Sequence, residues 1–232
     1  MKYFYLILLF IFIGCKSKST TTSIEKNIII PAYFYDSALW DRVIASDIKL
    51  VIFNPDNGPG TQKDPHYQDI LTSLTNTNKI PIGYVYTNYS LRDINEVKED
   101  IDKYLTFYPQ TKGIFLDETS EKEENFNYYK ELFDYIKSKG LMVILNPGTN
   151  TDKSYYNIAD YIVTYEGEYT SIPSSTCQNP KDILITYNTP QDKMEEIIKN
   201  YNCPYFFITD KNPQDAYLTL PSYLDEEENL LK

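Results

Sequence analysis

Histidine is almost missing from this chain of 232 residues, which contains a single copy, His66. Nucleophilic triads use a histidine base and zinc sites commonly use histidine ligands, so this scarcity argues against both kinds of site. The chain also has no P-loop, no GxGxxG fingerprint and no CxxC pair, which removes the usual signals for phosphate, dinucleotide and thiol chemistry. Carboxylate chemistry remains.

Positive charge is also scarce, because 22 Lys and Arg stand against 33 Asp and Glu, for a net charge of −11. Nucleic acid is therefore excluded as an expected partner, since its binding needs clustered basic side chains. A neutral or cationic ligand fits better, although acidity also serves solubility alone. A calcium site built from the acids is a lesser alternative, because no EF-hand spacing is present. We expect no metal and no cofactor.

Apolar residues are plentiful, at 42% of the chain, and aromatic residues make up 15%, with 23 Tyr against 11 Phe. This composition supports a packed core and argues against disorder. Tyrosine has an apolar ring and a polar hydroxyl, so its abundance suits a wet groove as well as a core.

The N-terminus, MKYFYLILLFIFIGC, carries one lysine, a short apolar run and a cysteine. The run is short for a membrane span and has the build of a secretory signal, and it resembles a bacterial lipoprotein signal. We expect residues 1–14 to be a signal peptide that is removed and Cys15 to be a lipid anchor, the only attachment to the membrane. Residues 15–24 would form a flexible tether, and 25–232 the folded domain, held in the bacterial cell envelope. The alternative is an uncleaved N-terminal anchor.

Two further cysteines, Cys177 and Cys203, would then lie outside the cytoplasm, where a disulfide can persist. Sequence alone does not bring their Cα atoms within bonding range, so their pairing stays open.

Eight apolar runs rich in β-branched and aromatic residues alternate with helical patterns, which is typical of strands buried on both faces. The runs are 27–34, 49–55, 81–87, 113–118, 141–147, 161–166, 182–188 and 205–210. Apolar residues recur at helical spacing in four intervening segments, 65–75, 91–108, 124–139 and 190–201. Residues 167–181 show no proper helix. The pattern predicts an α/β protein with a single (β/α)8 TIM-type barrel, and a doubly wound open sheet is the alternative.

The carboxyl ends of the expected strands are polar and aromatic, and in either fold function gathers there. These positions include Tyr33, Tyr35, Asp36, Asn54, Asp56, Tyr84, Tyr86, Asn88, Asp117, Glu118, Asn146, Glu166, Glu168, Tyr187, Asn188 and Asp210. Amides and tyrosine hydroxyls that bond sugar hydroxyls, rings that stack on sugars and a few carboxylates make a carbohydrate-type cleft.

Two groups of acids each close an apolar strand. In GIFLDETS, Asp117 and Glu118 follow the fourth run, and parity does not say which of them faces inward. Alternation in the sixth run places Thr164 and Glu166 on one face, which we expect to be the barrel mouth. A pair of carboxyl groups across a cleft is what glycoside hydrolysis requires.

Several segments together resemble spherulation-specific family 4, over about residues 30–224 and in the same order. They are PAYFYD, NPDNGPG, IGYVYTNYS, GIFLDETS, ILNPGTN, ADYIVTYE and LPSY. The resemblance implies a (β/α)8 fold and a glycoside hydrolase that acts on amino-sugar polysaccharide, as an endo-acting α-1,4-N-acetylgalactosaminidase.

The resemblance also implies roles for individual residues. Asp117 would be the nucleophile or charge stabiliser, Glu166 the general acid/base and Glu118 a supporting residue, with the roles open to permutation. The sugar groove would be lined by Tyr33, Asp36, Asn54, Asp56, Tyr84, Tyr86 and Asn146. The competing hypothesis is a catalytically inactive carbohydrate-binding or structural surface lipoprotein with the same groove.

Overall fold

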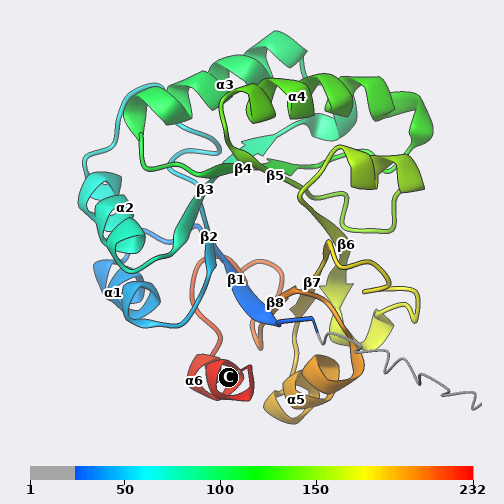
Figure 1. Ribbon diagram of the computed structural model, residues 1–232. Helices are drawn as coiled ribbons and strands as arrows, with labels where there is room; N and C mark the ends of the chain where they lie inside the picture. The colour runs from blue at the N-terminus through cyan, green and yellow to red at the C-terminus, as the bar shows by residue number, and fades with distance from the viewer. Residues whose placement is uncertain (1–23, 232) are drawn as a thin grey trace, which may run out of the picture.

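The protein is a closed barrel of eight parallel strands that pair in chain order, as seen along the barrel axis of the computed structural model (Figure 1). The strands are β1 (Asn27–Ala32), β2 (Leu50–Phe53), β3 (Ile80–Tyr86), β4 (Gly113–Asp117), β5 (Met142–Leu145), β6 (Tyr161–Glu168), β7 (Asp182–Tyr187) and β8 (Tyr205–Ile208). Pairing of β1 with β8 closes the barrel, so the predicted barrel is confirmed and the open sheet is wrong.

The structure describes residues 24–231. The expected signal peptide (1–14), the lipid anchor Cys15 and nearly all of the tether lie outside the described residues. Among residues 24–231, no helix is long and apolar enough to cross a membrane.

Within residues 24–231, six α-helices lie on the outside of the barrel (Figure 1). They are α1 (Ser37–Ala45), α2 (His66–Asn76), α3 (Ile94–Phe107), α4 (Phe126–Ser138), α5 (Gln191–Asn200) and α6 (Leu224–Leu230), with short 3-10 turns η1 (Asn88–Ser90), η2 (Glu123–Asn125), η3 (Lys153–Asn157) and η4 (Tyr169–Ser171). The four predicted helices are confirmed. The connections after β5 and β6 contain only 3-10 turns, as expected for 167–181.

Close packing between strands and helices depends on small residues at a few points. Gly83 of β3 faces α3, where a Cβ atom would lie 2.8 Å from the ring of Tyr104. The hydroxyl group of Tyr104 also donates a hydrogen bond to the Tyr84 carbonyl oxygen over 2.8 Å. Trp40 of α1 is fully buried and donates its indole N–H to the Phe34 carbonyl over 3.1 Å.

Strand β6 is irregular, because its register with β7 shifts between Val163 and Tyr165. Thr164 is the extra residue of this β-bulge, so simple alternation does not carry through it. Alternation along the strand therefore does not establish that Thr164 and Glu166 share a face, as the sequence led us to expect. Glu166 nonetheless points to the barrel mouth, as its hydrogen bonds show below.

The segment between β6 and β7 is tied to the barrel by a covalent bond. Cys177 in this segment forms a disulfide with Cys203, just before β8, with Cα atoms 4.9 Å apart. The pairing that the sequence left open is therefore present.

Candidate active site

A hollow of about 370 Å³ lies at the carboxyl ends of the strands and contains all three predicted catalytic acids. We call it the acid cleft; its lining is Tyr89, Asp117, Glu118, Asn146, Pro147, Gly148, Glu166 and Tyr187. The location agrees with the rule that barrel enzymes place their chemistry at this face.

Asp117 is the last residue of β4 and points into the acid cleft. Its register partner on β3 is Tyr86, and its carboxylate accepts a hydrogen bond from the hydroxyl of Tyr84 over 2.9 Å. The ring of Tyr84 stacks on that of Phe115, two residues before Asp117, as expected for side chains on one face of neighbouring strands. Asp117 is thus held by a rigid strand.

Asn146, which follows β5, joins the two acids through a single amide nitrogen. Its Nδ2 donates to Asp117 Oδ1 over 2.8 Å and to Glu166 Oε2 over 2.7 Å. Its Oδ1 accepts the backbone N–H of Gly148 over 3.0 Å, which fixes the orientation of the amide. The two bonded oxygens can be no farther apart than the two bond lengths together, about 5.5 Å, which is less than the separation of roughly 6.5–9.5 Å in inverting glycosidases.

Glu166 is held from its other side by two tyrosines. The hydroxyl groups of Tyr187, at the end of β7, and of Tyr217, in the segment after β8, both donate to its Oε1. These two hydroxyl groups also contact each other. Tyr33 packs against Tyr217 with ring centres 5.2 Å apart, so the cleft floor is aromatic.

Burial, and secondly the charge of Glu166, raise the pKa of Asp117 to about 6. Burial also raises the pKa of Tyr84, with Asp117 as the second cause, and the pKa of Tyr187 and Tyr217, with Glu166 as the second cause. The phenols therefore stay protonated and donate. Asp117 therefore keeps its proton up to about pH 6 and is ionised above it.

Glu118 also lines the acid cleft, because the chain turns sharply after Asp117. Glu118 has a left-handed backbone with φ of 50°, as do Asn88, Tyr89 and Ser90 in the facing turn η1, with φ of 47°, 53° and 72°. The two turns are joined by the bond from the Tyr89 N–H to the Glu118 carbonyl, 2.7 Å long. Such conformations are costly for residues with side chains and persist where surrounding contacts hold them.

The structure brings together Tyr33, Tyr84 and Asn146 with the acids, as predicted. Tyr86 lies beside them, and the guanidinium of Arg92 is 4.3 Å from the centre of its ring.

Three other predicted sugar-binding residues lie outside the acid cleft. Asp36 caps α1 by accepting the N–H of Ala38 over 2.7 Å. Asn54 accepts the N–H of Gly58 over 2.8 Å, and Asp56 lines a separate hollow in the loop after β2. Short polar side chains favour caps and turns, which accounts for the positions of these three residues. A role for these three in sugar binding stays a prediction that the shape of the cleft does not support.

Three residues of the site were not assigned by sequence. Tyr187 was among the strand-end residues selected by sequence but was given no role. Tyr89 projects into the cleft with 55% of its surface exposed, and only the local turn gives it that position. Tyr217 lies in a segment with no periodic pattern and reaches Glu166 through tertiary folding, so sequence held no signal for it.

Metal binding has no obvious site in residues 24–231, where no group of three or more His, Cys, Asp or Glu residues could hold an ion.

Comparison with known proteins gives a consistent set of relatives. The sequence model of spherulation-specific family 4 matches residues 27–230. Spherulin-4 of Physarum polycephalum is 39% identical over 155 residues, which cover 63% of this chain and 47% of that protein; the chain thus spans about half of this relative.

Solved structures extend the comparison to the fold. Aspergillus clavatus Sph3, crystallised in complex with GalNAc, is 25% identical, with a TM-score of 0.77 over 89% of this chain and 97% of that one. The Thermobaculum terrenum O-GlcNAc hydrolase is 13% identical, with a TM-score of 0.51 over 89% and 64%, and shares the fold alone.

Proposed function

The chain belongs to spherulation-specific family 4, and from that premise we propose that it is a glycosidase that hydrolyses an amino-sugar polysaccharide. One observation carries the proposal: two carboxyl groups, on Asp117 and Glu166, share the amide of Asn146 inside a cleft at the barrel mouth. Their oxygens are close enough for one group to attack a sugar while the other moves a proton.

The proposed reaction proceeds in two steps with retention. The Asp117 carboxylate attacks the anomeric carbon, the glycosidic C–O bond breaks, and Glu166 gives its proton to the departing oxygen. Glu166 then takes a proton from water, whose oxygen bonds to the anomeric carbon and releases Asp117.

We propose α-1,4-linked galactosamine, N-acetylated at least in part, as the sugar, cleaved within the chain. The GalNAc complex of the similar Sph3 structure supports this sugar. The net charge of −11 would also attract a polymer that carries free amino groups.

The second candidate is a carbohydrate-binding protein without catalysis. It is favoured by the full occupation of the Glu166 oxygens by Asn146, Tyr187 and Tyr217, which leaves few open positions for a sugar oxygen. This candidate predicts binding of the polymer with no new reducing ends.

Hydrolysis of galactosaminogalactan separates the candidates. We expect the wild type to release reducing ends and Glu166→Gln to release at least about 100-fold fewer, since general acid–base groups contribute roughly 10²–10⁴-fold. Glu131→Gln, an exposed carboxylate of α4, is the matched control and should keep the wild-type rate. Equal product from Glu166→Gln and the wild type would refute the site, and no product from the wild type would favour the binding protein.

The two roles can be separated with an aryl glycoside, whose leaving group needs no proton. Glu166→Gln should then recover the first step, seen as a burst of the aryl leaving group, and Asp117→Asn should not. The opposite result would exchange the two roles.

We propose further that Cys15 anchors the protein in a bacterial cell envelope by a lipid, which the leader sequence supports. Detergent-phase partition of the full chain, compared with Cys15→Ser, tests this proposal. Equal partition would refute it.

A further inference from the structure

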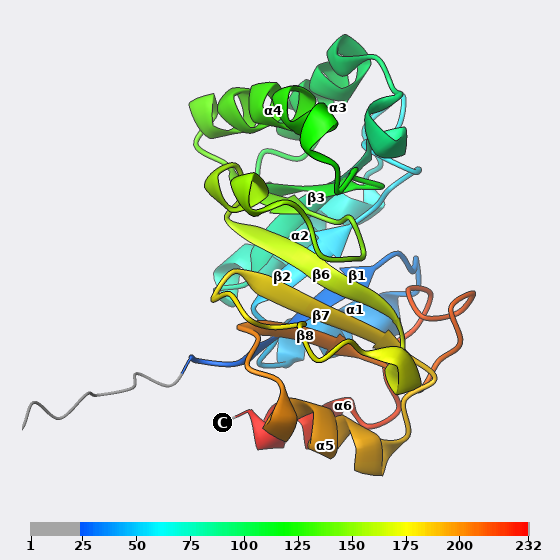
Figure 2. The same cartoon turned by 90° about the vertical axis from the view of Figure 1, so that its right-hand side faces the viewer.

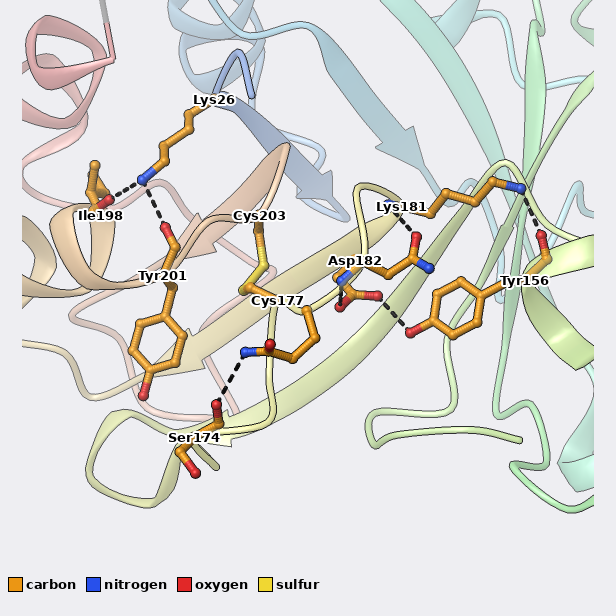
Figure 3. The surroundings of a disulfide bond; sticks show 11 residues. Lys26, Tyr156, Ser174, Cys177, Lys181, Asp182, Ile198, Tyr201 and Cys203 are labelled. Atoms are coloured by element: carbon orange, nitrogen blue, oxygen red, sulfur yellow. Dashed lines mark hydrogen bonds between the residues drawn. A yellow bond between two sulfur atoms is a disulfide. The ribbon is translucent and has the colours of Figure 1, made fainter. Parts of the chain in front are cut away.

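The barrel wall between β6 and β7 is unusual because no α-helix covers it. After η4 the chain runs back along the outside of the barrel as an irregular segment, residues 172–181, beside α5 (Figure 2). The disulfide between Cys177 and Cys203 fastens the middle of this segment to the start of β8 (Figure 3).

A hollow of about 740 Å³ lies between this segment and α5, and we call it the wall groove. It has about twice the volume of the acid cleft. Its lining runs from Tyr169 and Lys193 near the barrel mouth to Tyr201 and Asn202 at the far end of α5. Figure 3 shows the ring of Tyr201 beside the turn that contains Ser174, with the disulfide behind.

The lining of the wall groove is polar but carries no net charge. Lys193 and Glu196, its two charged residues, form an ion pair 2.7 Å long. The rest consists mainly of hydroxyl, amide and tyrosine side chains, including Gln178 and Asn200. These groups suit a neutral ligand rich in hydroxyls, whereas an anion or a cation would find no compensating charge.

One buried hydroxyl group of the wall groove lacks a hydrogen-bond partner within residues 24–231. Thr176 lines the groove with 1% of its surface exposed, and its Oγ1 has no hydrogen-bond partner within the described part of the chain. Buried hydroxyl groups are normally bonded, so a ligand hydroxyl is a natural partner for this one.

We propose that the wall groove is a second carbohydrate-binding site, which holds an uncharged, N-acetylated stretch of the same polysaccharide outside the acid cleft. The identity of the polymer rests on the proposed function. Glu166 in the cleft and Tyr169 at the groove are three residues apart on one chain, a reach of about 10 Å. One polymer chain can therefore contact both sites.

The disulfide gives the groove a fixed outer wall. The segment that carries Thr176 and Gln178 has no regular structure of its own, and Cys177 lies between these two residues. Reduction should therefore weaken polymer binding at the wall groove.

The test uses Glu166→Gln as background, so that bound polymer is not degraded. Retention on gels containing galactosaminogalactan should fall by about fivefold to tenfold when Tyr201→Ala and Tyr169→Ala are added, as expected for lost ring and hydrogen-bond contacts. Lys199→Ala, on the exposed side of α5, is the matched control and should keep full retention. Unfolding temperatures show whether each variant is folded.

A second measurement uses the catalytically intact protein. The rate on polymer divided by the rate on short oligosaccharides should fall in the groove variants and with dithiothreitol. Groove-dependent retention without hydrolysis by the wild type would refute the proposed function and leave the second site standing. Retention unchanged by both tyrosine substitutions would refute the second site alone.

Discussion

The amide of Asn146 should set the pH at which the carboxyl group of Asp117 ionises. Replacing it, as Asn146→Leu, removes a donor to Asp117 and a donor to Glu166 while keeping a side chain of similar size. A hydrogen bond to a charged group is worth about 1.5–3 kcal/mol, and one pKa unit corresponds to about 1.4 kcal/mol. Loss of the donor to Asp117 should therefore raise its pKa from about 6 by roughly one to two units.

The assay is the pH dependence of kcat/KM, together with a carboxyl-carbon NMR titration that needs no turnover. In the wild type, kcat/KM should rise as pH rises through about 6, because Asp117 can attack the sugar only as the ionised carboxylate. In Asn146→Leu this limb should move up by about one to two units, and maximal kcat/KM should drop about 100-fold, or roughly 2.7 kcal/mol. Asn150→Ala, an exposed amide after β5, is the control. A limb and a titration within about half a unit of the wild type would refute the reasoning.

Three further predictions concern stability. Tyr89→Gly should stabilise the fold by about 0.5–1 kcal/mol, because glycine relieves the strain of the left-handed backbone, and it should weaken polymer binding. Tyr89→Ala should weaken polymer binding without stabilising the fold. Equal denaturation midpoints for the two variants would contradict the strain argument. Glu227 is fully buried, and burial raises its pKa well above the usual value. The contribution of Glu227 to the free energy of unfolding should therefore be complete below about pH 4, where the carboxyl group is protonated in both states, and should decline as pH rises towards the folded pKa. Urea titrations should show Glu227→Gln gaining on the wild type by up to about 1.4 kcal/mol per pH unit, and a flat difference would contradict burial of the carboxyl. Gly83→Ala should cost about 1–3 kcal/mol by pressing on Tyr104, and an unchanged denaturation midpoint would show that the helix shifts freely.

The strands could be predicted because burial on both faces leaves a strong mark on sequence. β2 and β7 are buried at every position, and such runs, repeated eight times, define the barrel. Helix α1 escaped prediction because only Trp40 and Val43 of its nine residues are buried, too few for a clear period. The acidic C-terminal segment forms α6 and buries Glu227, which no charge pattern indicates.

The site was predictable to the extent that strands position it. Asp117, Asn146 and Glu166 stand at the ends of three successive strands, so the strand-end rule finds them together. The bulge at Thr164 shows why parity could not be trusted for orientation, since one extra residue reverses every later side chain. Tyr217 reaches the site from a segment that only the closed barrel brings near, which local sequence patterns do not encode.

The single tryptophan gives this protein a built-in optical reporter. Trp40 of α1 packs between Phe34 and Tyr67, with ring centres 5.2 and 6.0 Å away. Its indole emission should be blue-shifted in the native state and should be fed by energy transfer from the many tyrosines. During unfolding, loss of that emission would therefore report when α1 separates from the barrel. The disulfide-fastened wall lies elsewhere on the barrel and contains no indole, so its opening would be silent in the same trace.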